Sequence, residues 1–147
     1  MNKENWALFF HLLGAFLFVA GAVVAAVAYE AARRRTNPTE IAAMLQVARI
    51  GAVLVGPSGL LTVAFGLWLV DIEHIGYGTG WVDAAIVLFV AAGALGGFAG
   101  RKPKRARELA ERGQDPRVLL DDPLTRGLNY LAAAMVVAII VLMVFKP

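Results

Sequence analysis

Residues 6–29 read WALFFHLLGAFLFVAGAVVAAVAY and contain no charged side chain. The hydrocarbon core of a bilayer is about 30 Å thick, and an α-helix of roughly 20 residues crosses it. Three further apolar runs, residues 50–70, 82–100 and 128–145, are nearly as long and hold a single charge, Asp83. We therefore predict an all-α membrane protein, a bundle of four transmembrane helices that occupies residues 1–147 as a single domain.

The composition supports a membrane protein. The 147 residues are 59% hydrophobic and their mean hydropathy is +0.67, which is more apolar than a soluble domain of this size usually is. The first run is too long for the apolar core of a signal peptide, which spans about 7 to 15 residues. Because the chain has no cysteine, disulfides, thiolate metal sites and cysteine nucleophiles are excluded.

The basic residues mark two loops. Three arginines follow the first run at residues 33–35, and eight lysines and arginines lie within residues 101–127, whereas residues 71–81 hold none. Short cytoplasmic loops are enriched in Lys and Arg. Residues 30–49 and 101–127 are therefore predicted to be cytoplasmic, residues 71–81 to form an outer loop, and both termini to lie outside (N-out, C-out). The pI of 9.6 follows from this topology, so no nucleic-acid partner is needed to explain it.

Local signals predict where helices begin and end. Asn37-Pro38 and Asp122-Pro123 each offer a side-chain cap followed by proline at the first helical position. Gly113 is a suitable stop for a helix that continues from the third run. Along that extension, opposite charges recur at helical spacing in the pairs Lys104 with Glu108, Arg107 with Glu111, and Glu108 with Arg112.

Small residues and one proline indicate how the helices pack. Glycines let helix backbones approach closely in lipid, and they recur in the first three runs at residues 14, 21, 51, 56, 59, 66, 93, 96, 97 and 100. These glycine-rich faces predict packing against other membrane subunits or self-association. Gly56-Pro57-Ser58-Gly59, with Thr62 one turn on, either lines a cavity or forms a packed kink satisfied by the hydroxyl groups.

Three residues are candidate ligands of a cofactor or metal: His11, His74 and Met143. His11 lies inside the first span, and an ionisable residue there is a functional candidate. In the predicted topology His74 and Met143 lie toward the same outer side, and imidazole and thioether groups are ligands of haem and copper. The sequence thus predicts a cofactor site with these three residues, or a metal site with the two histidines. The alternative is that His11 hydrogen-bonds another helix, His74 is solvated and Met143 fills space.

The sequence lacks the residues on which several classes of enzyme and transporter depend. No carboxylate lies in the middle of any predicted span, which disfavours proton-driven transport. The sequence contains no Ser/His/Asp arrangement, phosphate loop or metalloprotease helix motif. No catalytic residue is therefore assigned.

Three segments carry a family resemblance: residues 11–21 (HLLGAFLFVAG), residues 56–62 (GPSGLLT) with 66–69 (GLWL), and residues 97–101 (GFAGR). Together they resemble an uncharacterised bacterial family of predicted four-span membrane proteins, which implies a multi-pass protein of the bacterial plasma (inner) membrane. More distantly, His11 followed by small residues is similar to the CopD-like copper-resistance proteins and the HemJ-type protoporphyrinogen oxidases. That similarity implies haem b or copper at His11.

Two functions from different classes remain. One is an accessory or assembly subunit, without catalysis, of a larger membrane complex. The other is a haem- or copper-binding membrane protein that uses His11 in electron transfer or cofactor handling.

Overall fold

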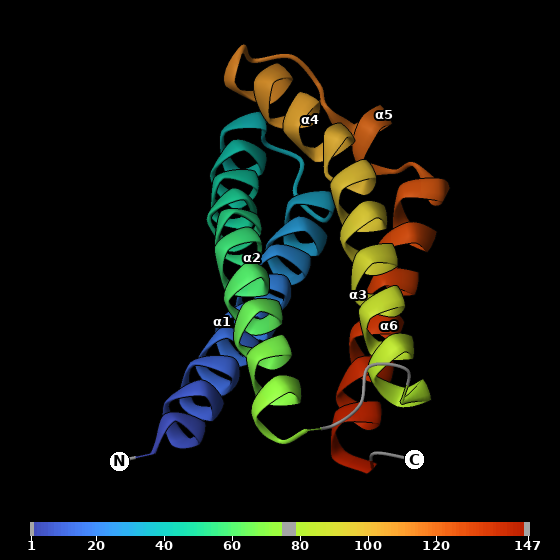
Figure 1. The fold of residues 1–147 in the computed structure, drawn as a ribbon. Coiled ribbons are helices and arrows are strands. Elements are labelled where there is room, and N and C mark those ends of the chain that lie inside the picture. The colour runs from blue at the N-terminus through green and yellow to red at the C-terminus, as the bar shows by residue number, and fades with distance from the viewer. Residues whose placement is uncertain (1, 75–78, 146–147) are drawn as a thin grey trace. The chain divides into compact units, whose positions relative to one another are not determined.

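The computed structural model describes residues 2–74 and 79–145, and every regular element in these ranges is an α-helix. The helices are α1 (Lys3–Arg33), α2 (Pro38–Ile72), α3 (Gly80–Ala99), α4 (Arg101–Glu111), α5 (Arg117–Leu120) and α6 (Pro123–Phe145) (Figure 1). Within the described ranges, four helical stretches are long and apolar enough to cross a membrane: α1, α2, α3 with α4, and α6. The predicted all-α fold with four spans is confirmed. Part of the predicted outer loop, residues 75–78, lies outside the described residues.

The helices are longer than the apolar runs that predicted them. α1 has 31 residues and α2 has 35, which correspond to roughly 46 and 52 Å of helix. Polar side chains support the extra turns of α1, since Glu30 pairs with Arg33 at 2.9 Å and with Arg34 at 3.4 Å. Hydropathy therefore marks the lipid-crossing part of each helix, and helical hydrogen bonding continues beyond it.

The predicted helix starts are present. The Asn37 side chain accepts a hydrogen bond from the Thr39 backbone N–H at 2.9 Å, which caps α2 with Pro38 in its first turn. α6 begins in the same way, because Asp122 accepts a bond from the Thr125 N–H at 2.9 Å and Pro123 follows the cap.

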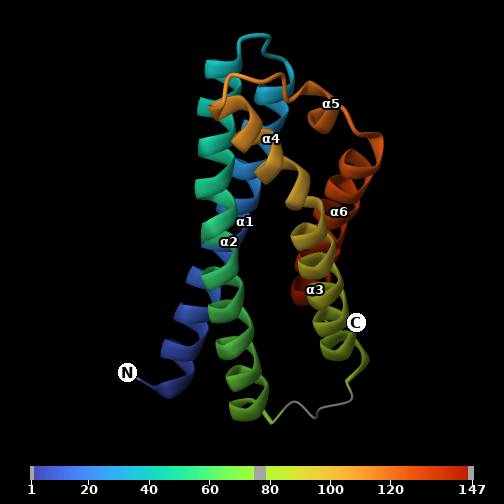
Figure 2. The ribbon, with the colours of Figure 1, turned by 90° about the horizontal axis from the view of Figure 1, so that it is seen from above.

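The chain divides into two compact units, residues 1–35 with 43–76 and residues 36–42 with 77–147. In the first unit, α1 and α2 lie side by side as an antiparallel hairpin, seen in both views (Figures 1 and 2). In the second unit, α3 packs along α6, and α4 packs against α5. Each unit thus contributes two of the predicted spans.

A small residue at every seventh position forms the α1 side of the first hairpin. Ala7, Gly14, Gly21 and Ala28 are all buried, and a seven-residue repeat keeps one side of a helix facing its partner. The backbones come close at Gly21, where an added Cβ would lie 2.8 Å from the Gly51 carbonyl oxygen. The predicted tight packing is confirmed for this hairpin.

The helical extension after α3 is also as predicted in outline. α4 ends in a left-handed turn at Gly113, whose φ is 71°, and the Gln114 N–H donates back to the Leu109 carbonyl at 3.0 Å. Arg107 pairs with Glu111 at 3.5 Å. Glu108, however, pairs with neither Lys104 nor Arg112 in the part of the chain that the structure describes. Of the three oppositely charged pairs at helical spacing, the Arg107–Glu111 pair is thus the one that forms an ion pair among the described residues.

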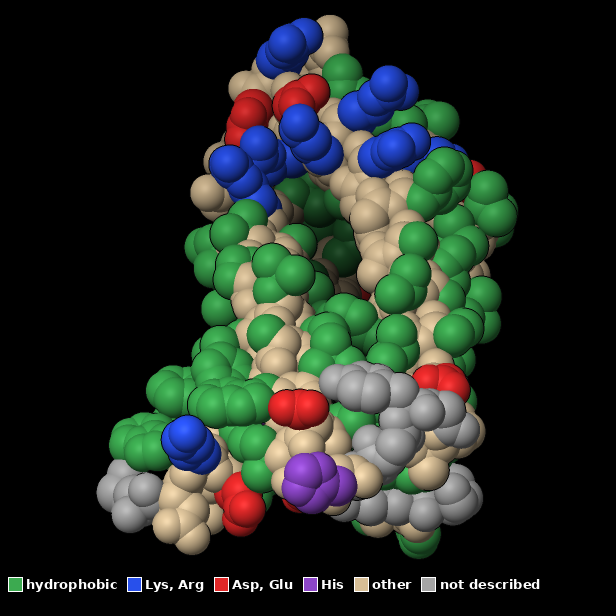
Figure 3. Space-filling view, viewed as in Figure 1, with side chains coloured by type: hydrophobic (Ala, Val, Ile, Leu, Met, Phe, Trp, Pro, Cys, Tyr) green, Lys and Arg blue, Asp and Glu red, His purple; other side chains and the backbone are tan. Residues whose placement is uncertain are grey.

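Large apolar side chains cover the outside of the helices, as expected for surfaces that face lipid (Figure 3). Phe16 is 73% exposed and Leu60 is 74% exposed. In a soluble domain, exposed apolar side chains of this size would mark an interaction site or promote aggregation. In a membrane, these side chains are solvated by the hydrocarbon of the lipid. Lysine and arginine side chains instead gather at the α4 end (Figure 3).

Candidate functional site

His11 sits between the two helices of the first hairpin. Its Nδ1 lies 2.8 Å from the backbone carbonyl oxygen of Thr62 on α2. A carbonyl oxygen only accepts, so Nδ1 carries the proton and donates. In a neutral imidazole, Nε2 then keeps its lone pair. His11 therefore joins α1 to α2 and holds the tautomer whose Nε2 can bind a ligand.

Gly66 makes room for the imidazole. A Cβ built on Gly66 would lie 2.9 Å from Nδ1 and 3.0 Å from Cε1 of His11, closer than such contacts normally are. No side chain larger than hydrogen fits there while the ring keeps its place. The pairing of His11 with Gly66 and with the Thr62 carbonyl was not predictable from the sequence, because neither a backbone carbonyl nor a gap has a sequence signature.

Two side-chain hydroxyl groups donate hydrogen bonds to the α2 backbone next to this contact. Ser58 donates to the Leu54 carbonyl at 2.6 Å, and Thr62 donates to the Ser58 carbonyl at 2.8 Å. Proline at position 57 removes the N–H that the Val53 carbonyl would otherwise receive. α2 nevertheless continues through Pro57 as one helix. The two hydroxyls bond the Leu54 and Ser58 carbonyls and not the Val53 carbonyl, so the cavity and the packed kink both stay predictions.

Aromatic rings surround the same end of the hairpin. Trp6 stacks on Phe10 with ring centroids 5.8 Å apart, and Phe10 contacts Phe65 of α2 at 4.9 Å. Phe65 in turn contacts Trp68 at 5.7 Å. Phe10 and Phe65 directly precede His11 and Gly66 in the chain, so these rings link α1 to α2 at the same level as the imidazole.

His74 forms no hydrogen bond or ion pair with His11 among the described residues. His74 follows the end of α2, in a left-handed conformation with φ 52°. Gly66, which contacts the His11 ring, lies six residues before Ile72 at the helix end, or roughly 9 Å along the axis. This separation is within the combined reach of two histidine side chains, so a site shared by His11 and His74 stays a prediction.

Met143 lies in α6 and is 36% exposed. It belongs to the second unit, whereas His11 belongs to the first. Within residues 2–74 and 79–145, no group of three or more His, Cys, Asp or Glu side chains is arranged to hold a metal ion. His11 makes a hydrogen bond between two helices, and a site that joins it to His74 or Met143 stays a prediction.

A polar cluster that sequence reasoning missed lies where α4 and α6 begin. Lys102 Nζ lies 2.6 Å from Asp122 Oδ2, and the Thr125 hydroxyl donates to the same oxygen at 2.6 Å. The bond from Lys102, followed by those from Thr125, lowers the pKa of Asp122 from 3.8 to about 2. The Asp122-Pro123 cap was readable from the sequence, but its lysine partner lies 20 positions away and was not.

Asp122→Asn is expected to lower the thermal stability of the protein at pH 7. Because the folded-state pKa lies below the unfolded value of 3.8, the ionised carboxylate stabilises the fold above pH 3.8, and this contribution is lost as the pH falls toward 2. The gap between variant and wild type should therefore close over that range in thermal melts in detergent. Asp71→Asn is the matched control, and an equal shift in it would contradict the assignment.

The comparisons with known proteins agree with this architecture. Residues 6–147 match the model of a family described as "Predicted integral membrane protein (DUF2269)". The chain belongs to the DUF2269 family. The match covers all four spans of this DUF2269 protein and confirms the predicted family of integral membrane proteins. No curated protein and no solved structure matches the chain.

Proposed function

We propose that this protein is a small non-catalytic subunit or assembly factor of a larger membrane complex and binds a transmembrane helix of its partner through α3. The observation that carries the proposal is a glycine face on α3. A Cβ built on Gly93, Gly96 or Gly97 would meet no described atom within 4 Å. These glycines therefore do not serve the packing of α3 on α6, unlike Gly14, Gly21 and Gly51 in the first hairpin.

The spacing of these glycines suits a helix partner. Gly93 and Gly97 are four residues apart, as are Gly96 and Gly100, which is the pattern that lets two membrane helices approach closely. A glycine inside a helix costs about 0.5–1 kcal/mol relative to alanine. Three within five residues of α3 are costly unless a close contact uses them, and a partner helix would supply that contact.

Single cysteines test the proposal, because the chain has none of its own. Val90→Cys places a probe about 60° round the helix from Gly93, and Val87→Cys places one about 120° from Gly93. The two valines are 65% and 66% exposed and are matched in that respect. A photoreactive maleimide on Val90→Cys, activated in the native membrane, should crosslink one partner membrane protein, and Val87→Cys should do so much less.

A second variant pair shows whether the glycines matter. Gly93→Leu should reduce the crosslink about tenfold, because a large side chain prevents close approach. Ala94→Leu, on the next residue and a different side of α3, should not. Crosslinks only to lipid, to the first hairpin or to a second copy of the chain would overturn the proposed accessory role.

A second candidate function is haem or copper binding at His11, and one observation favours it. Metal-binding histidines usually donate their other ring N–H to a carbonyl or carboxylate, which orients the ligating nitrogen. The bond from His11 Nδ1 to the Thr62 carbonyl has this form. His74 and Met143 remain the proposals for a second ligand.

The test of the second candidate is an absorption spectrum and a metal analysis of protein purified gently from its native membrane. A Soret band or stoichiometric copper would support it. A colourless, metal-free preparation from cofactor-replete cells would overturn it. For either function we propose a bacterial inner membrane, with the arginine-rich segments in the cytoplasm and both termini outside, since cationic segments resist translocation.

A further inference from the structure

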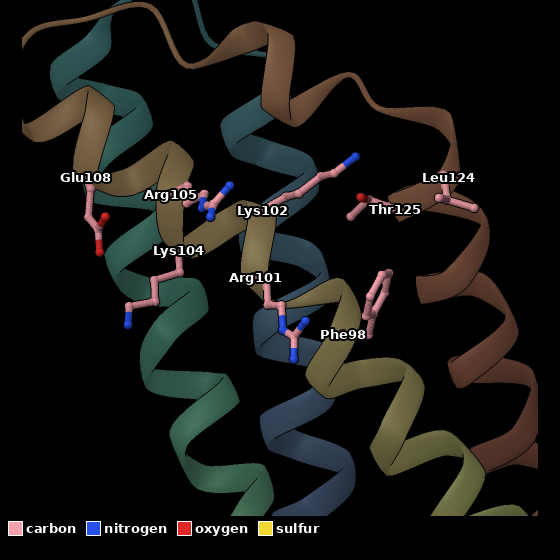
Figure 4. A pocket seen from close by; sticks show the side chains of 8 residues that line it. All are labelled: Phe98, Arg101, Lys102, Lys104, Arg105, Glu108, Leu124 and Thr125. Atoms are coloured by element: carbon pink, nitrogen blue, oxygen red, sulfur yellow. The ribbon is translucent and has the colours of Figure 1, made fainter.

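A basic hollow lies within the second unit, where α3 passes into α4 and α6 begins (Figure 4). Its volume is about 490 Å³. Arg101, Lys102 and Arg105 of α4 line it, with Phe98 of α3 and Leu124 of α6 beside them. Lys104 and Glu108 also line the hollow, on the side of α4 away from Leu124 (Figure 4).

The basic side chains of this hollow differ in whether a carboxylate neutralises their charge. Lys102 pairs with Asp122 at 2.6 Å. Arg101 and Arg105 form no ion pair with a carboxylate in the described ranges, and both are exposed. They lie four residues apart on one helix, so their side chains emerge about 5–6 Å from each other on the same side. Two unpaired guanidinium groups at this spacing can bind the oxygens of one phosphate.

Apolar side chains adjoin these arginines. The Arg101 guanidinium lies 5.4 Å from the centre of the Phe98 ring, a cation–π contact that holds it beside α3. Phe98 is 55% exposed and Leu124 is 61% exposed. Both stand at the ends of helices apolar enough to cross a membrane, so the hollow combines positive charge with an apolar edge at the level where a span meets its charged segment.

We propose that this hollow binds the headgroup of an anionic phospholipid. The phosphate would lie between Arg101 and Arg105, and the glycerol and first methylenes would lie along Phe98 and Leu124. Basic pockets between membrane helices on the cytoplasmic side recognise anionic headgroups in this manner. A free phosphate would use the arginines but not the apolar edge, which is why a lipid is the better fit. The inference does not depend on the proposed accessory role.

Native mass spectrometry of the detergent-purified full chain tests it, with phosphatidylglycerol and phosphatidylcholine as competing lipids. Wild-type protein should retain phosphatidylglycerol in preference to phosphatidylcholine. The double variant Arg101→Gln/Arg105→Gln should bind phosphatidylglycerol roughly 30-fold more weakly, since each basic residue near a membrane contributes about 1 kcal/mol. Circular dichroism verifies that the variant keeps its helices.

The matched control is Arg49→Gln/Arg112→Gln, which removes the same charge from exposed arginines outside the hollow. Equal weakening in this control would overturn the proposal, because it would mean that diffuse surface charge attracts the lipid. Phe98→Ala changes no charge and should weaken phosphatidylglycerol binding about two- to fivefold through loss of the ring contact. That variant tests the proposal even if the double variant does not fold.

Competition with inorganic phosphate shows whether the hollow binds a phospholipid headgroup or a free phosphate ion. If millimolar phosphate displaces phosphatidylglycerol from wild-type protein, and Phe98→Ala binds the lipid as well as wild type does, the hollow is a site for a soluble anion and the lipid proposal fails. Retention of the lipid in excess phosphate supports it.

Discussion

Replacing Gly51 by alanine is expected to destabilise the protein by about 3 kcal/mol, at the upper end of what overpacking costs. A Cβ at this position would lie 2.6 Å from the Gly21 carbonyl oxygen and 2.7 Å from the Ala25 backbone nitrogen. Both atoms belong to the backbone of α1, so no side-chain rotation can relieve the clash. The two helices would have to move apart along their length.

Gly56→Ala is the matched control for this variant. Gly56 lies in the same helix, and an added Cβ would meet no described atom within 4 Å. Because alanine is the better helix former, this change should be neutral or slightly stabilising. Thermal unfolding of both variants in one detergent, followed by circular dichroism, makes the comparison. A Gly51→Ala protein as stable as wild type would contradict the close α1–α2 contact.

Much of the fold could be predicted because membrane helices have strong sequence signals. Hydropathy located all four candidate spans, and the Asn37-Pro38 and Asp122-Pro123 pairs located two helix starts to the residue. The ends of α1 were less predictable. Its helix continues to Arg33 through ion pairs with Glu30, and hydropathy has no signal for a helix that has left the lipid.

The role of each glycine was predictable only where a pattern pointed to one side of a helix. Ala7, Gly14, Gly21 and Ala28 repeat every seven residues, and this side of α1 is the one that α2 covers. Gly93 and Gly97 have an equally suggestive spacing, yet α6 does not use them. Which helix covers a small-residue face depends on pairing, and the sequence of one helix does not contain that information.

For the candidate site, the sequence indicated the residue but not its surroundings. His11 was identifiable because an ionisable group inside a span is rare. Its acceptor is the backbone carbonyl of Thr62, and any residue type could have provided it. In the basic hollow, the sequence showed opposite charges at helical spacing along α4, whereas Lys102 pairs with Asp122, which lies 20 positions further along the chain. Contacts between segments far apart in the chain decided both cases.

His11→Ala is expected to destabilise the first hairpin by about 2 kcal/mol. It removes the interhelical hydrogen bond to Thr62, and such bonds in membrane proteins contribute roughly 0.6–1.7 kcal/mol. It also leaves a space next to Gly66 where the ring had been, and unfilled space in a helix interface adds to the loss. Thermal unfolding in detergent measures the change.

Gly66→Ala should have opposite effects in the two backgrounds. In wild type its methyl group would lie 2.9 Å from His11 Nδ1 and displace the ring, so stability falls. In His11→Ala the same methyl enters the vacated space and restores part of the stability. A double-mutant cycle should therefore show coupling on the order of 2 kcal/mol. Purely additive effects would show that the ring does not occupy this position.

The double variant His11→Ala/Gly66→Ala also separates the two candidate functions. If haem or copper is bound to wild type and absent from this stably folded variant, His11 is a ligand, and its bond to Thr62 serves to orient Nε2. If the variant instead keeps its partner crosslink through Val90→Cys, the imidazole is a structural link between α1 and α2. The accessory role would then rest on α3, where the glycine face lies, and His11 would matter only through the hairpin that it stabilises.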